Sequence, residues 1–317
     1  MKYRDDTDQF LYEYVRHGMT PFFGVPSVDS SDPASAYLGA RVVLLGIPYD
    51  GGTSQNPGAR FAPYSVRQAS IFAVNADAIG RLSGRGAVDG GNVPAPPRSP
   101  SAMRELVEHA ITGVLSAGAA PFVVGGDHSV VLPILRAVAK RLGPVAVVHI
   151  DAHTDTATPS EFLGGDPYHH GAPLRYALEE GLIERGQLHQ IGIRMGFDAA
   201  LTREHAVNIY DIDEVAQGVR PLMERVRAAI GQRPTYVTFD IDAVDPAFAP
   251  GTGTPAPGGL TSREAIALVR SLGGLRIVGM DVVEVLPALD HADLTSLLAA
   301  TLLMQGIAAL GAPGEPG

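Results

Sequence analysis

The stretch Val145-Ala146-Val147-Val148-His149-Ile150-Asp151-Ala152-His153-Thr154-Asp155 decides the fold of this chain. Its first six residues form a mostly apolar run that is typical of a buried parallel strand, and an acidic cluster follows where the run stops. Two other runs have the same form: residues 121–124 lead into Gly125-Gly126-Asp127-His128, and residues 235–239 lead into Asp240-Ile241-Asp242. Because ligands collect beyond the carboxyl ends of parallel strands, we expect the three clusters to lie together there.

The side chains of these clusters are those of a metal site. Residues two apart in an extended chain point the same way, so each cluster presents its polar groups on one face. The six candidate metal ligands are His128, Asp151, His153, Asp155, Asp240 and Asp242. Four carboxylates and two imidazoles repel one another unless a cation neutralises them, and this mixture of oxygen and nitrogen ligands suits Mn²⁺ or a similar ion. Asp151 and Asp240 can each bridge through two oxygens, which predicts two ions with a shared water or hydroxide.

Composition narrows the class of protein. The 317 residues include 45% hydrophobic and 18% charged residues, which is typical of one large globular domain in the cytoplasm with no membrane segment. A net charge of −10 argues against nucleic-acid binding and is compatible with a cationic substrate. The chain contains no cysteine, so disulfides, thiolate ligands and a cysteine nucleophile are excluded.

The order of predicted elements indicates an α/β fold. Residues 1–40 are irregular and predict an N-terminal arm, whereas residues 41–317 predict a single α/β domain. Within that domain, strands alternate with helices, which predicts a mostly parallel, doubly wound sheet. The predicted strands cover residues 42–47, 122–124, 145–150, 190–193, 207–210, 235–239 and 275–283. Residues 84–100 are expected to be irregular, and the long loops 156–171 and 244–259 leave the same edge of the sheet as the acidic clusters.

Several ordered motifs resemble those of the ureohydrolases, the group that includes arginases, agmatinases, guanidino-acid hydrolases and proclavaminate amidinohydrolase. The resemblance runs from about Gly24 to Leu310. Besides the three acidic clusters, it rests on Gly46-Ile47-Pro48-Tyr49-Asp50-Gly51-Gly52, Pro57-Gly58-Ala59-Arg60-Phe61-Ala62-Pro63, His170-Gly171, Ala249-Pro250-Gly251-Thr252-Gly253-Thr254-Pro255 and Asp281-Val282-Val283-Glu284-Val285. It implies a three-layer αβα fold, two Mn²⁺ ions per subunit, and a homo-oligomer that is a trimer or a hexamer.

The resemblance also implies a division of the ligands between the two ions. One ion would be held by His128, Asp151, Asp155 and Asp240, and the other by Asp151, His153, Asp240 and Asp242. Asp155 would take a proton from the attacking hydroxide and pass it to the leaving amine. Glu284 would bind the guanidinium nitrogens of a small guanidino substrate, and His170 would relay protons or position that substrate.

The substrate is left open between two kinds of compound. Ala157 stands where arginases carry an asparagine, which argues against L-arginine and favours an agmatinase-like activity that converts agmatine to putrescine. The alternatives are a guanidino-acid hydrolase, acting as a guanidinobutyrase or guanidinopropionase, and a natural-product amidinohydrolase resembling proclavaminate amidinohydrolase. Arg175 and Arg194 are candidate anchors for a carboxylate tail, and Glu161 and Asp166 for an amine tail. Two hypotheses from other functional classes remain: a single-zinc deacetylase and a catalytically silent homologue.

Overall fold

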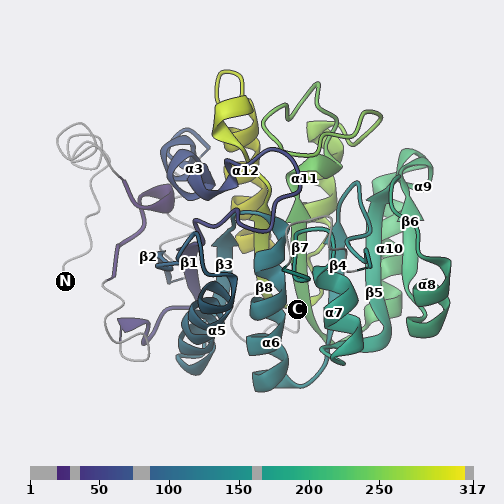
Figure 1. The fold of residues 1–317 in the computed structure, drawn as a ribbon, viewed down its shortest axis with the longest axis horizontal. Helices are drawn as coiled ribbons and strands as arrows, with labels where there is room; N and C mark the ends of the chain where they lie inside the picture. Colours follow the sequence, from purple (N-terminus) through teal and green to yellow (C-terminus); the bar gives the residue numbers. More distant parts are fainter. Residues whose placement is uncertain (1–19, 29–35, 74–85, 159–165, 311–317) are drawn as a thin grey trace.

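The described chain is built around one parallel sheet. The computed structural model describes residues 20–28, 36–73, 86–158 and 166–310. These residues contain an eight-stranded sheet with the order β2-β1-β3-β8-β7-β4-β5-β6, in which every neighbouring pair is parallel (Figure 1). The strands are β1 (Val42–Gly46), β2 (Ala87–Asn92), β3 (Ala120–Val124), β4 (Val145–Ile150), β5 (Ile183–Ile193), β6 (Asn208–Asp211), β7 (Pro234–Asp240) and β8 (Arg276–Val283).

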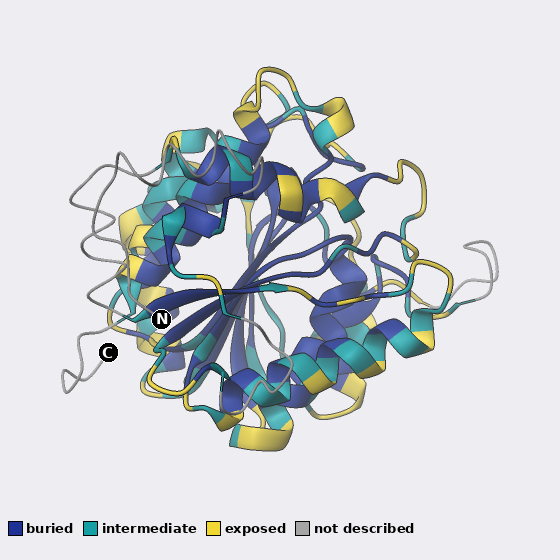
Figure 2. Ribbon diagram, turned by 90° about the vertical axis from the view of Figure 1, so that its left-hand side faces the viewer, coloured by how far each residue is buried: buried dark blue, intermediate teal, exposed yellow. Residues whose placement is uncertain are grey.

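Helices cover both faces of the sheet, which confirms the expected three-layer αβα architecture. On one face, α5 packs on α6 and α6 on α7; on the other, α3, α12, α11 and α10 pack in that order. Figure 2 shows the buried strands between these two layers. The helices are α3 (Ala62–Ser70), α5 (Pro100–Ser116), α6 (Val131–Leu142), α7 (Pro173–Glu179), α8 (Ala199–His205), α9 (Ile212–Ala216), α10 (Val219–Ile230), α11 (Ser262–Arg270) and α12 (Leu294–Ala309).

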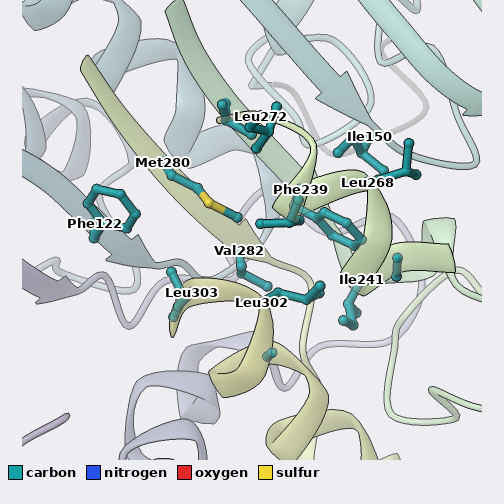
Figure 3. Packing of buried hydrophobic residues seen from close by; sticks show 14 of the residues in the cluster. Phe122, Ile150, Phe239, Ile241, Leu268, Leu272, Met280, Val282, Leu302 and Leu303 are labelled. Atoms are coloured by element: carbon teal, nitrogen blue, oxygen red, sulfur yellow. The ribbon is translucent and has the colours of Figure 1, made fainter. Parts of the chain in front are cut away.

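The strands supply side chains alternately to two apolar cores. In β8, Val282 belongs to the core beneath α3, α12, α11 and α10, whereas its neighbour Val283 belongs to the core beneath α5, α6 and α7. Figure 3 shows part of the first core, in which Phe239 and Val282 from the sheet lie near Leu302 of α12. Strands buried on both faces are continuous apolar runs, which is why the sequence marks most of them clearly.

Local sequence signals set several helix ends. Pro100 and Pro173 stand in the first turn of α5 and α7, where a missing N–H costs no helical hydrogen bond. Thr261 and Glu264 form a capping box at the start of α11, since each side chain accepts a hydrogen bond from the other's backbone N–H. These signals fix where each helix begins after its loop.

The expectation that residues 84–100 are irregular is wrong in part, because β2 lies within them. Two glycines interrupt the apolar pattern of this edge strand, and its pairing with β1 depends on residues far away in sequence. The helices α8 and α9 were not expected, and β5 begins at Ile183 rather than near residue 190. Of the two expected long loops, residues 159–165 lie outside the described residues, and residues 244–259 contain only the isolated bridges Val244↔Leu260 and Thr252↔Val285.

Part of the N-terminal segment packs against the domain. Phe22 and Phe23 are fully buried in the core beside α3, and the guanidinium of Arg67 lies 4.1 Å above the Phe22 ring. The Phe22 backbone N–H donates to Asp89 Oδ2 at 2.8 Å, and Arg67 Nε donates to the same oxygen at 2.9 Å. The division of the chain at residue 40 stays a prediction. In the described part of the chain, none of the helices is long and apolar enough to span a membrane.

Candidate metal centre

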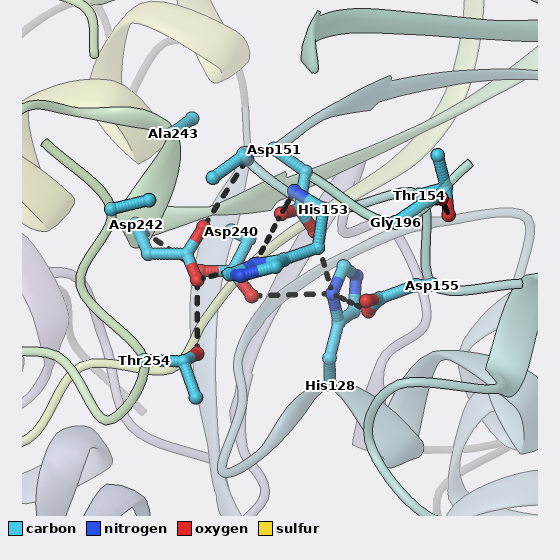
Figure 4. A network of polar contacts seen from close by, with 12 residues as sticks. His128, Asp151, His153, Thr154, Asp155, Gly196, Asp240, Asp242, Ala243 and Thr254 are labelled. Atoms are coloured by element: carbon cyan, nitrogen blue, oxygen red, sulfur yellow. Dashed lines mark hydrogen bonds and ion pairs between the residues drawn. The ribbon is translucent and has the colours of Figure 1, made fainter. Parts of the chain in front are cut away.

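The acidic clusters meet in the middle of the sheet. His128 follows β3, Asp151 follows β4, Asp240 ends β7 and Glu284 follows β8. These strands are adjacent in the order β3-β8-β7-β4 (Figure 1). Their carboxyl ends therefore place the four side chains in one region. The six residues expected as metal ligands are all brought together there, as Figure 4 shows.

A first group of donor atoms surrounds His128 Nδ1. The Oδ2 atoms of Asp155, Asp151 and Asp240 lie 2.8, 3.2 and 3.3 Å from this nitrogen. Ligand bonds of about 2.1 Å set at right angles place neighbouring donor atoms about 3 Å apart, so these separations are those expected around one ion. His128 Nδ1 is buried and makes no hydrogen bond to any described residue, which is the state of a ligand nitrogen that faces an ion rather than a proton donor.

A second group forms around Asp151, His153 and Asp242. His153 Nδ1 lies 3.0 Å from Asp242 Oδ2 and 3.5 Å from Asp151 Oδ1. Asp151 therefore offers Oδ2 to the first group and Oδ1 to the second, which is the arrangement of a bridging carboxylate. Asp240 places Oδ2 in the first group, while its Oδ1 accepts the Asp242 N–H at 2.8 Å. The two groups fit two divalent ions that share Asp151.

The cluster attracts positive charge. Burial, followed by the charges of Asp242 and Asp151, raises the pKa of Asp240 well above its usual range. Burial and the charge of Asp151 raise the pKa of Asp242 to about 7. Burial opposes the charged form of His153, but hydrogen bonds to Asp151 and Asp242 raise its pKa overall to about 12. A raised pKa means that these groups bind protons readily, because a proton offsets the negative charge of the cluster. Divalent ions bound there would offset the same negative charge.

A buried chain of hydrogen bonds orients His128. Its Nε2 lies 2.8 Å from Thr238 Oγ1, which donates to Asp281 Oδ1 at 2.7 Å, while the Tyr236 hydroxyl donates to Asp281 Oδ2 at 2.8 Å. Because the Thr238 hydroxyl hydrogen goes to Asp281, Nε2 of His128 carries the proton and Nδ1 keeps its lone pair for the cluster. Asp281 belongs to the motif at residues 281–285. Its contacts with Tyr236 and Thr238 on β7 join residues distant in sequence, so the spacing of the motif does not predict them.

Glu284 and His170 lie beside this cluster. Glu284 Oε1 accepts the His128 backbone N–H at 2.9 Å and lies 2.8 Å from His170 Nδ1. His170 Nε2 accepts the Ser54 backbone N–H at 3.2 Å, so Nδ1 carries the proton that is donated to Glu284. The other oxygen, Glu284 Oε2, is buried and has no hydrogen-bond partner among the described residues. It is free to accept an N–H donor from a ligand.

Two of the three expected catalytic residues have a left-handed backbone. Asp155 has φ 49° and Glu284 has φ 61°. Such conformations cost of order 1–3 kcal/mol for residues other than glycine and collect at functional sites. At Asp155 the turn directs the side chain to His128, and at Glu284 it directs the side chain to His170.

A cavity of about 590 Å³ opens beside the cluster. Its wall includes Asp155, His170, Thr254 and the exposed aromatic ring of Phe197. Apart from cluster residues and His170, Asp198 is the one charged side chain among the described residues that line it.

Three of the residues considered as substrate anchors have other partners. Arg194 donates to backbone carbonyls, including those of Asp242 and Ala256. Arg175 donates to Asp198 Oδ2 and to the carbonyls of Thr156 and Ala157. Asp166 pairs with Arg104 at 3.1 Å, whereas Glu161 lies outside the described residues.

One buried polar contact of the cluster involves a residue outside the motifs. His149 is fully buried on β4, and its Nε2 lies 2.7 Å from Asp151 Oδ2. Period-two spacing could have signalled this, since His149 and Asp151 are two residues apart at the end of one strand. Asp127 and Asp245 shape loops: Asp127 accepts the Gly52 N–H and Asp245 accepts the Ala247 N–H.

The fold and the centre are those of a known class of hydrolases. A family model described as the arginase family matches residues 40–308, and the chain belongs to this family. It is an amidinohydrolase, an enzyme that acts on carbon–nitrogen bonds in linear amidines.

Individual relatives are similar over most of the chain. A proclavaminate amidinohydrolase from Streptomyces clavuligerus is 47% identical over 271 residues, which are 82% of this chain and 85% of that protein. A solved structure described as a proclavaminate amidinohydrolase from Streptomyces clavuligerus is 42% identical and has a TM-score of 0.83; the match covers 92% of this chain and 98% of that one. A guanidinopropionase from Pseudomonas aeruginosa is 40% identical (91% of this chain, 90% of that protein), and an agmatinase from Salmonella paratyphi B is 43% identical (83% and 85%).

Proposed function

We propose that this protein hydrolyses the guanidino group of a small guanidino compound to urea and an amine, with two Mn²⁺ ions bound by the six cluster residues. The observation that carries the proposal is the pair of donor groups that share Asp151, beside the unpartnered Oε2 of Glu284. When bound, two divalent ions supply hydroxide at neutral pH by lowering the pKa of water. The guanidinium carbon is a poor electrophile, so it requires such a nucleophile close by.

In this mechanism the chain's own residues bind the substrate and move its protons. Glu284 Oε2 accepts an N–H donor of the guanidinium in a charge-assisted hydrogen bond. Asp155 lines the cavity and carries one oxygen beyond its contact with His128, so it accepts a proton and returns it to the leaving amine. His170, held between Glu284 and Ser54, positions the substrate and relays protons at the cavity wall.

We propose agmatine as the preferred substrate and putrescine as the amine product. The described residues that line the cavity include no arginine or lysine that could hold a carboxylate tail, and the guanidinium of Arg175 is occupied by Asp198 and two carbonyls. The second candidate is a guanidino-acid or natural-product amidinohydrolase, because the similar proteins include a guanidinopropionase and a proclavaminate amidinohydrolase. We also propose a homo-oligomer, a trimer or a hexamer, which sedimentation velocity would test.

Urea release by the Mn²⁺-loaded protein tests this function across agmatine, 4-guanidinobutyrate, 3-guanidinopropionate, L-arginine and a bulkier guanidino acid. Preference for agmatine supports the first candidate, and preference for a guanidino acid supports the second. Two metal ions per chain by elemental analysis would exclude a single-zinc deacetylase. If none of the compounds releases urea although two ions are bound, the proposed substrates are wrong.

A further inference from the structure

His149 occupies a defined position behind the candidate metal centre. It is completely buried on β4, and its Nε2 lies 2.7 Å from Asp151 Oδ2. Gln190 is its register partner on the neighbouring strand β5. The amide nitrogen of Gln190 lies 3.1 Å from His149 Nδ1 and 2.6 Å from the carbonyl oxygen of Thr154.

These contacts determine which nitrogen of His149 carries the hydrogen. The Thr154 carbonyl can only accept, so the NH₂ end of the Gln190 amide must face it. That same NH₂ group then donates its other hydrogen to His149 Nδ1, which must be the acceptor. The hydrogen of the imidazole is therefore on Nε2 and is donated to Asp151 Oδ2.

This assignment argues against two simpler roles. An imidazole that ligates an ion presents a lone pair, but Nδ1 of His149 faces Gln190 and Nε2 presents a hydrogen. A histidine whose role is only to fill the core needs no polar partner in the cluster. His149, in contrast, donates its N–H to the carboxylate that both groups of donor atoms share.

The contact has a consequence for the orientation of Asp151. Its Oδ1 accepts the His153 backbone N–H at 2.6 Å, and its Oδ2 accepts the His149 N–H. One donor on each oxygen fixes the rotation of the carboxylate about χ2. Each oxygen then has a second lone pair free for an ion: that of Oδ2 faces the group around His128, and that of Oδ1 faces the group around His153.

We propose that His149 is a positioning residue that holds Asp151 in its bridging orientation, and that Gln190 sets the tautomer of His149 for this purpose. The proposal rests on the proposed function only in assuming that the cluster binds two ions. Without the His149 N–H, the carboxylate is free to rotate away from one of them. Outer-shell partners of this kind change metal affinity by roughly 10–100-fold.

The test compares His149→Phe, His149→Gln and Gln190→Met with the wild-type protein. Mn²⁺ affinity is measured by calorimetry, and the spin coupling between two Mn²⁺ ions by electron paramagnetic resonance. We expect His149→Phe to lose roughly 10–100-fold in Mn²⁺ affinity and to weaken the coupling. His149→Gln retains an N–H donor and should recover part of both, and Gln190→Met should show a smaller loss in the same direction.

His189→Phe is the matched control, because it removes a buried histidine on β5 whose hydrogen bond is to Tyr210 rather than to a cluster residue. It should bind Mn²⁺ as the wild-type protein does. Wild-type affinity and coupling in His149→Phe would overturn the proposal and make His149 a core residue. Loss of one whole ion without recovery in His149→Gln would overturn it in favour of a ligand. A wild-type protein that binds no Mn²⁺ would overturn the proposed function together with this inference.

Discussion

Replacement of His189 by phenylalanine should remove the contribution of this buried histidine to the protein's sensitivity to mild acid. His189 is fully buried, its ring stacks on Tyr210, and its Nε2 has no hydrogen-bond partner among the described residues. Burial, assisted by the charge of Arg233, lowers the pKa of His189 from 6.5 to about 4. The folded protein thus binds a proton less readily than the unfolded chain, so stability is present above pH 6.5 and is lost as the pH falls towards 4.

The size of the effect follows from the two pKa values. At about 1.36 kcal/mol for each pH unit, the whole difference is roughly 3 kcal/mol, and about 2 kcal/mol of it is lost between about pH 7.5 and about pH 5. His189→Phe keeps a flat ring against Tyr210 and gives up only the 3.3 Å contact between Nδ1 and the tyrosine hydroxyl. Its free energy of unfolding should therefore fall about 2 kcal/mol less over this interval.

Urea unfolding followed by circular dichroism at both pH values measures the difference. Both proteins are studied with a chelator, so that protonation of the candidate metal ligands contributes equally to each. His109→Phe, which makes the same change at an exposed position of α5, should behave as the wild-type protein. Equal losses of stability in His189→Phe and the wild-type protein would refute the assignment of this acid sensitivity to His189.

Three further predictions concern other buried groups. Asp281→Asn should weaken Mn²⁺ binding roughly 10–100-fold, because the two ends of an amide cannot accept hydrogen bonds from both Thr238 and Tyr236. Calorimetry measures this affinity, and an unchanged value would contradict the role of these hydrogen bonds in orienting His128. Asp89→Ala should lower the free energy of unfolding by about 3–5 kcal/mol, since it leaves Arg67 buried without its partner; a loss below 1 kcal/mol in urea unfolding would count against this. Removal of divalent ions by a chelator should lower the melting temperature, with a stabilisation of about 2.7 kcal/mol expected at 100 times the dissociation constant; an unchanged melting temperature would argue against binding to the folded state.

Two-residue spacing alone does not predict how the residues of the candidate centre divide into two groups, whereas the family resemblance does. Two-residue spacing placed Asp151, His153 and Asp155 on one face. In the structure the extended backbone continues to His153, which pairs with Met195, but turns left-handed at Asp155. Asp155 therefore joins the group around His128 rather than the one around His153. Asp242 likewise lies beyond the end of β7, in a short 3-10 helix that the Asp240 side chain caps.

The features that sequence reasoning missed depend on partners distant in the chain. The glycine-rich strand β2 is stabilised by its pairing with β1 and by the ion pair of Asp89 with Arg67, neither of which periodicity can reveal. The contact of His149 with Asp151 could be anticipated from spacing, but its tautomer depends on Gln190, on another strand. The long apolar strands can be recognised without knowing their partners, because strands buried on both faces are continuous apolar runs in the sequence.

The strand order also has a consequence for the synthesis of the protein. β7 and β8 are the last strands along the chain, yet they lie between β3 and β4 in the sheet. A nascent chain that has reached only β6 therefore lacks the two strands that join β2-β1-β3, which His128 follows, to β4-β5-β6, which Asp151 follows. Until β7 and β8 are made, the inner edges of β3 and β4 have no partner, and unpaired strand edges promote aggregation. The candidate centre is thus completed late, because Asp240 and Asp242 come with β7 and Glu284 follows β8.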